Sequence, residues 1–194
     1  MQKLLLLIEY FSCEKNVIND RRLKMENQFE GQYSCEFENE VIKISARVVT
    51  KELVDHIFEF YFPDVICFDD SVEVLDERAF SRQNLALVDL ESAKNVQVIG
   101  DSCFEGAFNI DCNNAFGKVL RIGKKCFKDA IILGKIEMPR LTCVPDRAFW
   151  NTDAYSIFLP SATSVSDSAF KYASTEAGID CKVQSEAQKT AILL

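Results

Sequence analysis

A small residue followed by phenylalanine recurs five times at nearly equal spacing, and this recurrence constrains the fold more than any other feature of the chain. The phenylalanines follow Ala or Cys at intervals of 24, 23, 22 and 21 residues, at Phe80, Phe104, Phe127, Phe149 and Phe170. An aliphatic residue stands five positions before each phenylalanine, and a further apolar residue stands three positions before that one. Because so short a unit cannot bury its apolar face alone, neighbouring units must stack and share one core.

Each unit also carries three residues that alternate apolar, variable and apolar, which is the pattern of a half-buried strand. These triplets are Val88–Leu90, Ile110–Cys112, Ile136–Met138, Ile157–Leu159 and Ile179–Cys181. Proline directly follows two of them, at Pro139 and Pro160, and ends the strand there because it has no amide to donate to a ladder. The middle residue of each triplet is expected to face outward.

The eight cysteines contain no Cys-x-x-Cys pair, so the usual zinc-ribbon and redox spacings are absent. Cys103 and Cys126 stand where other units have Ala before the phenylalanine, and Cys112 and Cys181 stand where others have Leu or Met. We therefore expect these four to pack as small apolar residues rather than to form disulfides. This usage favours a reducing, cytoplasmic location over a secreted or surface one.

The first 64 residues are less regular, and we interpret residues 1–64 as an N-terminal cap that includes a degenerate first unit. Alternation in residues 33–37 predicts a strand that pairs with Val41–Ile44 as a hairpin. Helical spacing of apolar residues predicts an amphipathic helix over 51–61, which Pro63 ends. We expect residues 1–13 to dock on the fold as a helix or strand. For the apolar Ala191–Leu194 two interpretations stay open: it docks as a terminal cap, or the given sequence stops short of the end of the repeat.

The repeat resembles the BspA-like (Treponema-type) branch of the leucine-rich repeat superfamily. The resemblance lies in phrases such as Val98–Phe104 and Ile136–Leu141, and it covers about Val65 to Val183. It implies a curved solenoid with parallel strands on one face and turns or short helical segments on the other. The predicted fold is thus an α/β leucine-rich repeat solenoid over 65–194, with about five to six repeats of 21–26 residues behind the N-terminal cap.

Catalytic and membrane signatures are missing. The single histidine, His56, has no second histidine for a metal cluster, and neither a phosphate-binding loop nor a dinucleotide-binding Gly-x-Gly-x-x-Gly motif occurs. We therefore expect no enzymatic activity, no cofactor and no metal. No run of 18 apolar residues occurs, so no membrane span is expected. A net charge of -8 argues against a general nucleic-acid binder, which needs positive charge to displace counterions.

The outward residues of the strand triplets form the candidate binding surface. We expect them to line up as one largely acidic column on the concave sheet, at Asp89, Asp111, Glu137, Phe158 and Asp180. Such a column suits a partner protein with a basic surface, although acidic residues also serve solubility. Trp150 follows an anchor phenylalanine, and it is either an interaction hot spot or packed on an adjacent turn.

Three functions are compatible with this pattern. The first is a non-enzymatic protein-binding module that uses the concave face of the solenoid. The second is an inhibitor or antagonist of a basic, nucleic-acid-processing enzyme, by analogy with acidic leucine-rich repeat ribonuclease inhibitors. The third is a surface adhesin, a role common among BspA-like proteins. The first is our principal hypothesis.

Overall fold

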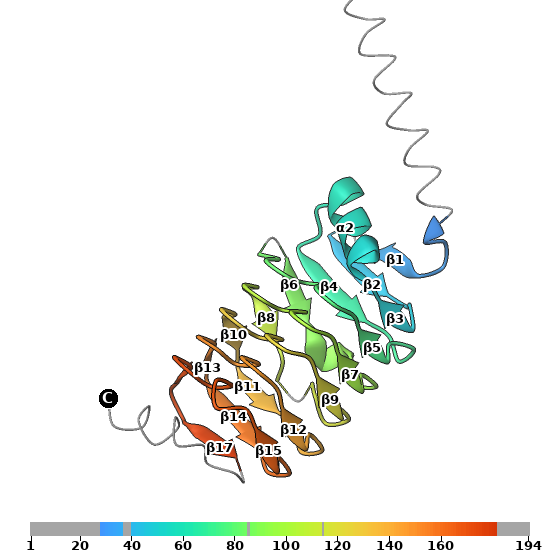
Figure 1. The fold of residues 1–194 in the computed structure, drawn as a ribbon. Coiled ribbons are helices and arrows are strands. Elements are labelled where there is room, and N and C mark those ends of the chain that lie inside the picture. The colour runs from blue at the N-terminus through green and yellow to red at the C-terminus, as the bar shows by residue number, and fades with distance from the viewer. Residues whose placement is uncertain (1–27, 37–39, 85, 114, 182–194) are drawn as a thin grey trace, which may run out of the picture.

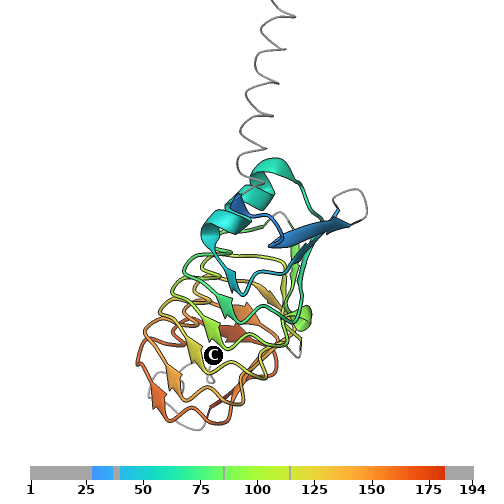
Figure 2. The same ribbon diagram turned by 90° about the vertical axis from the view of Figure 1, so that its right-hand side faces the viewer.

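Successive units of the chain stack as turns along one axis, and this confirms the predicted solenoid (Figure 1). The computed structural model describes residues 28–36, 40–84, 86–113 and 115–181. Figure 2 shows the turns as loops that follow one another, with strands on their sides. The expected docking of residues 1–13 and of Ala191–Leu194 lies outside the described residues.

The anchor phenylalanines form a single buried stack through the interior of the solenoid. Their ring centroids are 5.2–5.6 Å apart from Phe80 to Phe170, and the interplanar angles are 3–12°. Phe68 meets the first ring edge-on at 5.9 Å and 82°. The predicted aromatic column is therefore confirmed, and every turn contributes one ring to it.

Backbone hydrogen bonds join the turns at the same level as these rings. The amide of Phe104 donates to Cys126 O, that of Phe127 to Ala148 O, and that of Phe149 to Ala169 O. Two residues after each anchor the chain adopts a left-handed conformation, and this residue donates its amide to the next turn in the first four units. The five left-handed residues are Arg82, Gly106, Asp129, Asn151 and Tyr172. This shared geometry keeps the equivalent residues of successive turns in columns.

The main ladder begins as an antiparallel hairpin and continues as a parallel sheet. Its six strands are β1 (Tyr33–Glu36), β2 (Val41–Ile44), β4 (Val65–Phe68), β6 (Leu87–Asp89), β8 (Ile110–Asp111) and β10 (Ile132–Leu133). Tyr33 lies opposite Ile44, which confirms the predicted hairpin. A three-stranded parallel sheet follows, formed by β11 (Lys135–Glu137), β14 (Ser156–Leu159) and β17 (Ile179–Cys181).

A further parallel ladder runs through the aliphatic residues that stand five positions before each phenylalanine. It comprises β3 (Val48–Val49), β5 (Val74–Leu75), β7 (Val98–Ile99) and β9 (Arg121–Ile122), and then the pair β12 (Cys143–Val144) and β15 (Ser164–Val165). Another pair is β13 (Asp153–Ala154) and β16 (Ser174–Thr175). Sequence reasoning predicted turns or short helical segments here. The turns are present, for example over 77–82, 101–106 and 124–129, and short strands precede them; within the described residues the solenoid also has one 3-10 helix, η1 (Leu90–Ser92).

Two glycines allow the turns to approach closely after the strands β7 and β9. A Cβ at Gly100 would overlap the backbone of Glu77, and one at Gly123 would overlap the backbone of Asp101. Both glycines directly follow the buried isoleucine of their strand, so the phrase Ile-Gly marks where two turns touch.

The four cysteines assigned to repeat positions are buried, as predicted. Burial raises the pKa of the Cys103, Cys112 and Cys126 thiols far above the ordinary value, because the apolar interior disfavours the thiolate. These thiols therefore act as small apolar side chains.

The helix α2 (Lys51–Phe60) closes the N-terminal end of the core. It begins where predicted and ends one residue before the predicted end at 61. Thr50 caps it by accepting a hydrogen bond from the amide of Leu53, which satisfies one otherwise free amide of the first turn. Its buried side includes Leu53, Val54 and Ile57. Since β2 and β3 pair in parallel with β4 and β5, the degenerate first unit joins both ladders. The proposed boundary at residue 64 stays a prediction.

Replacing Phe127 with Ala should destabilise the protein by about 3–5 kcal/mol, because it removes a fully buried ring from the middle of the stack. The free energy of unfolding from urea denaturation measures this change. The matched control is Phe62→Ala, where the ring is 83% exposed and the expected change is within about 0.5 kcal/mol. A loss below about 1 kcal/mol for the Phe127 variant would refute the stack.

Candidate interaction surface

The five outward residues of the triplets are placed as the sequence predicts, each between inward-facing neighbours. Asp89, Asp111 and Glu137 are partly exposed, and Phe158 and Asp180 are exposed. The flanking side chains are buried, apart from the partly buried Ile179. The strands therefore hold these five side chains pointing away from the core.

The prediction of one continuous acidic column is wrong. Asp89 lies opposite Asp111, but the neighbour of Asp111 on the next strand is Leu133 rather than Glu137. Glu137 belongs to the separate three-stranded sheet, where it lies opposite Phe158. Phe158 in turn lies opposite Asp180. The structure thus brings together an acidic pair and a separate set of two carboxylates around a phenylalanine.

A break in the ladder at Gly134 separates the two groups. Gly134 has a φ of 91°, and a Cβ there would overlap the Asn113 side chain, which accepts a hydrogen bond from the Lys135 amide. Glycine is the residue that adopts this conformation at no steric cost. The chain thereby inserts β10 before the strand β11 that the triplet pattern predicts.

Exposed apolar side chains occupy the junction between the two sheets. The Leu133 side chain is exposed beside Asp111. The Tyr155 side chain, directly before β14, is also exposed, and the Tyr155 amide donates a hydrogen bond to Gly134 O. Phe158 of β14 is 37% exposed. We call the set Asp89, Asp111, Leu133, Glu137, Tyr155, Phe158 and Asp180 the strand-face patch. Sequence reasoning missed Leu133 and Tyr155, because no triplet contains them.

Trp150 lies in a turn, apart from the strand-face patch. Its ring contacts Tyr172 of the next turn edge-on, with centroids 5.0 Å apart, and the cationic groups of Arg147 and Lys171 lie 5.4 and 5.9 Å from it. Packing on an adjacent turn, one of the two roles predicted for Trp150, is therefore observed. Its role as a hot spot stays a prediction.

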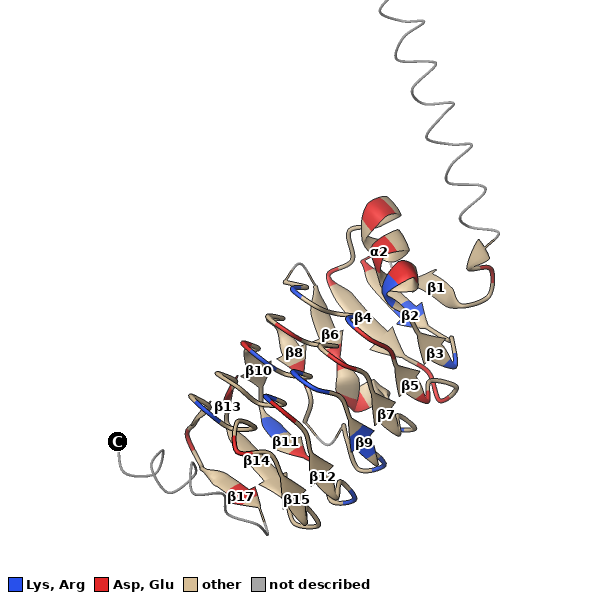
Figure 3. Cartoon of the chain, viewed as in Figure 1, with Lys and Arg blue, Asp and Glu red and all other residues tan. Residues whose placement is uncertain are grey.

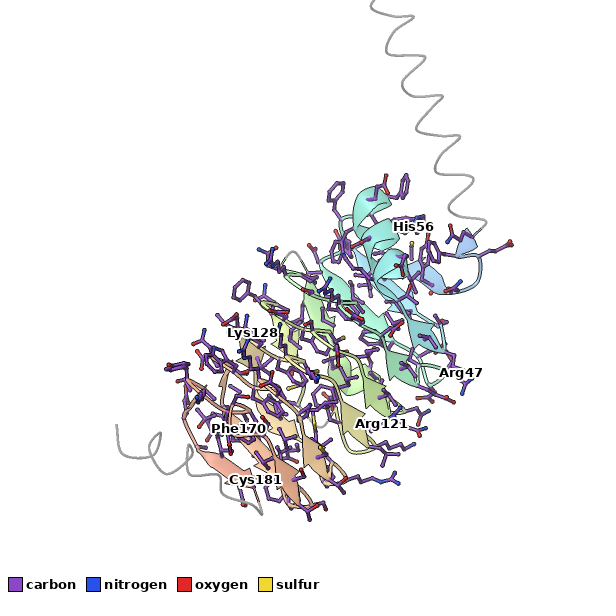
Figure 4. All side chains as sticks on the ribbon, in the orientation of Figure 1. Arg47, His56, Arg121, Lys128, Phe170 and Cys181 are labelled. Atoms are coloured by element: carbon purple, nitrogen blue, oxygen red, sulfur yellow. The ribbon has the colours of Figure 1, made fainter. Side chains whose placement is uncertain are left out.

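On the turn side, Lys128 is paired with two carboxylates. Figure 3 shows both signs of charge on the turns, and Figure 4 shows Lys128 at one edge of the solenoid and Arg121 at the other. The Lys128 ammonium lies 2.9 Å from Glu105 Oε1 and 2.6 Å from Asp129 Oδ2. Hydrogen bonds from Lys128 and Asn151 lower the pKa of Asp129, and bonds to Asp129 and Glu105 raise that of Lys128.

His56 packs in the N-terminal part of the core. Its Nε2 lies 2.9 Å from the Tyr33 hydroxyl, and its ring contacts Phe29 and Phe60. Among the described residues there is no group of three His, Cys, Asp or Glu side chains arranged to hold a metal ion. In the same part of the chain, no helix combines the length and hydropathy needed to cross a membrane.

Comparison with known protein families identifies the family of this repeat. A family model described as the BspA type leucine rich repeat region matches residues 51–176 in 6 copies. The chain belongs to this family. The match to BspA-type repeats extends upstream of the stretch recognised from the triplets and includes α2, consistent with the pairing of β2 and β3 to the following turns.

The BspA-type family indicates a binding module that mediates protein–protein interaction. No curated protein and no solved structure shows significant similarity to the chain.

Replacing Lys128 with Met should make the free energy of unfolding vary less with pH in the acid range. Burial raises the pKa of the Glu105 carboxyl, but hydrogen bonds from Lys128 and Ser102 outweigh the effect of burial, so that this pKa lies below 4.5. The pKa of Asp129 lies below 3.8. Carboxyls with a lowered pKa stabilise the fold above their ordinary pKa, and this stabilisation is lost as pH falls through the folded-state value.

We expect the Lys128→Met variant to be less stable than the wild type by up to about 1 kcal/mol above about pH 5, since the groups are partly exposed. The difference should shrink steadily below pH 4.5, where the carboxyls become protonated. Urea denaturation at several pH values measures it, and Lys124→Met, at an exposed lysine, is the control. An equal loss at pH 3 and pH 7 would contradict this assignment.

Proposed function

We propose that the chain is a non-enzymatic protein-binding module and that the strand-face patch is its binding surface. The observation that carries the proposal is the exposure of Leu133, Tyr155 and Phe158 beside outward carboxylates. Large apolar side chains exposed together on a soluble protein mark interaction sites more often than isolated ones do. Aromatic residues are also enriched among those that dominate binding energy.

The backbone beneath the patch supports this role because it is preorganised. Glu137, Phe158 and Asp180 lie on hydrogen-bonded parallel strands whose neighbouring side chains are anchored in the core. Rigid presentation lowers the entropy lost on binding, so contacts made by these side chains convert more fully into affinity.

The charges of the patch favour a partner with a basic surface. Asp89 and Asp111 lie opposite each other on adjacent strands, about 4.8 Å apart along the sheet, and like charges at that spacing repel. Lysine or arginine from a partner relieves this repulsion. The net charge of -8 adds long-range attraction for such a partner.

A cytoplasmic location is also part of the proposal. Cys103, Cys112, Cys126 and Cys143 carry free thiols, which suits a reducing compartment.

Inhibition of a basic nucleic-acid-processing enzyme is one specific form of the same surface chemistry. Adhesion at a cell surface uses the same fold without requiring a basic partner.

A double variant tests the patch directly. Leu133→Ser together with Phe158→Ser removes apolar contact while leaving the buried core in place, so binding should weaken about tenfold or more without loss of stability. Proteins retained by the immobilised chain are identified by mass spectrometry, purified, and titrated against both forms by calorimetry.

The control is Leu120→Ser, which removes a similarly exposed leucine beside β9 of the other ladder. Its affinity should match the wild type. Raising the salt concentration from 50 to 300 mM should weaken binding, because exposed ion pairs are screened. If the double variant binds as the wild type does, the patch is not the site, and a flat salt response rules out a basic partner.

A further inference from the structure

A groove beside the turns forms a second candidate site, and it is lined by residues other than those of the strand-face patch. Its volume is about 410 Å³. Phe108, Ile131 and Asp153 line one wall, and they lie four residues after their anchor phenylalanines. Asp129, Asn151 and Tyr172 line the other wall, two residues after their anchors. The groove therefore runs along the solenoid axis, between two columns of equivalent positions.

One end of the groove is apolar and accessible. Phe108 and Ile131 are both exposed, and they lie on neighbouring turns because the Ile131 amide donates to Ala107 O. Tyr172, at the other wall, is 72% exposed although its ring meets Trp150 edge-on. An aromatic side chain this exposed presents a ring face that a cation can contact.

The charge that lines the groove is negative and only half paired. Asp129 is bonded to Lys128 and to the Asn151 amide group. Asp153 is exposed, and it takes part in none of the ion pairs found in the described part of the chain. The described residues that line the groove include no lysine or arginine.

We propose that this groove binds an extended peptide segment in which an apolar residue is followed, two positions later, by arginine or lysine. The apolar side chain packs against Phe108 and Ile131, and the cation lies between the Asp153 carboxylate and the Tyr172 ring. Charge complementarity at Asp153 selects a basic rather than an acidic segment.

The spacing of the turns matches this segment. Ile131 lies opposite Asp153 on the adjacent turn, and Phe108 is one turn further away, so the apolar contact and the carboxylate are about 5–10 Å apart. Alternate side chains of an extended peptide are about 6.6–6.8 Å apart, which falls within that span. The site goes beyond the proposed function, because it lies on different residues and needs no contact with the strand-face patch.

Nuclear magnetic resonance titration of the full chain tests the groove. The probe is acetyl-Gly-Leu-Ser-Arg-Gly-amide, and the comparison peptide carries Glu in place of Arg. We expect saturable shifts of the amides of Phe108, Ile131, Asp153 and Tyr172 with the arginine peptide. The glutamate peptide should give none. Saturable shifts confined to Glu137, Phe158 and Asp180 would instead place binding at the strand-face patch and overturn the assignment to the groove.

Two variants locate the cation. Asp153→Asn and Tyr172→Ala should each weaken binding of the arginine peptide about fivefold, as expected for loss of an exposed ion pair or cation–aromatic contact. Asp167→Asn, which removes an exposed carboxylate that belongs neither to the groove nor to the strand-face patch, should leave the affinity unchanged. Unchanged affinity in both groove variants, or no saturable binding by the wild type, would overturn the proposal.

Discussion

The stack of phenylalanine rings sets the repeat of the whole molecule. Rings 5.2–5.6 Å apart, together with amides that donate to the next turn at the same level, fix where each turn lies on its neighbour. The position before each ring must be small, which explains why all five units have either Ala or Cys there. Both strand ladders follow, because the aliphatic residues of each unit are then brought opposite those of the next.

Columns of equivalent residues are the functional consequence of this register. A single exposed side chain presents little surface, but the same position in successive turns recurs about every 4.8 Å and forms a continuous strip. The strand-face patch and the turn-side groove are both built from such columns, on different residues. The unequal lengths of the units offset the strips locally, and the break at Gly134 is the clearest case.

Features that depend on one class of residue at one regular spacing could be predicted from the sequence. The phenylalanine stack, the outward triplet residues, the hairpin at Tyr33 and the α2 helix all belong to this group. The ladder of β3, β5, β7 and β9, with the pair β12 and β15, was not predicted. Its strands are two residues long, and their outward residues, such as Val98, Arg121 and Cys143, share no chemical character. Aligning the triplets by motif placed Glu137 beside Asp111, whereas the backbone places Leu133 there.

Hydrogen exchange at the anchor amides tests the central claim most directly. The amides of Phe104, Phe127 and Phe149 donate to the following turn inside the core, so they should open only with global unfolding. We expect their exchange to be slower than that of unprotected amides by a factor of about 1,000 or more. Exchange at these three amides as fast as in an unprotected chain would show that the turns are not stacked in this register.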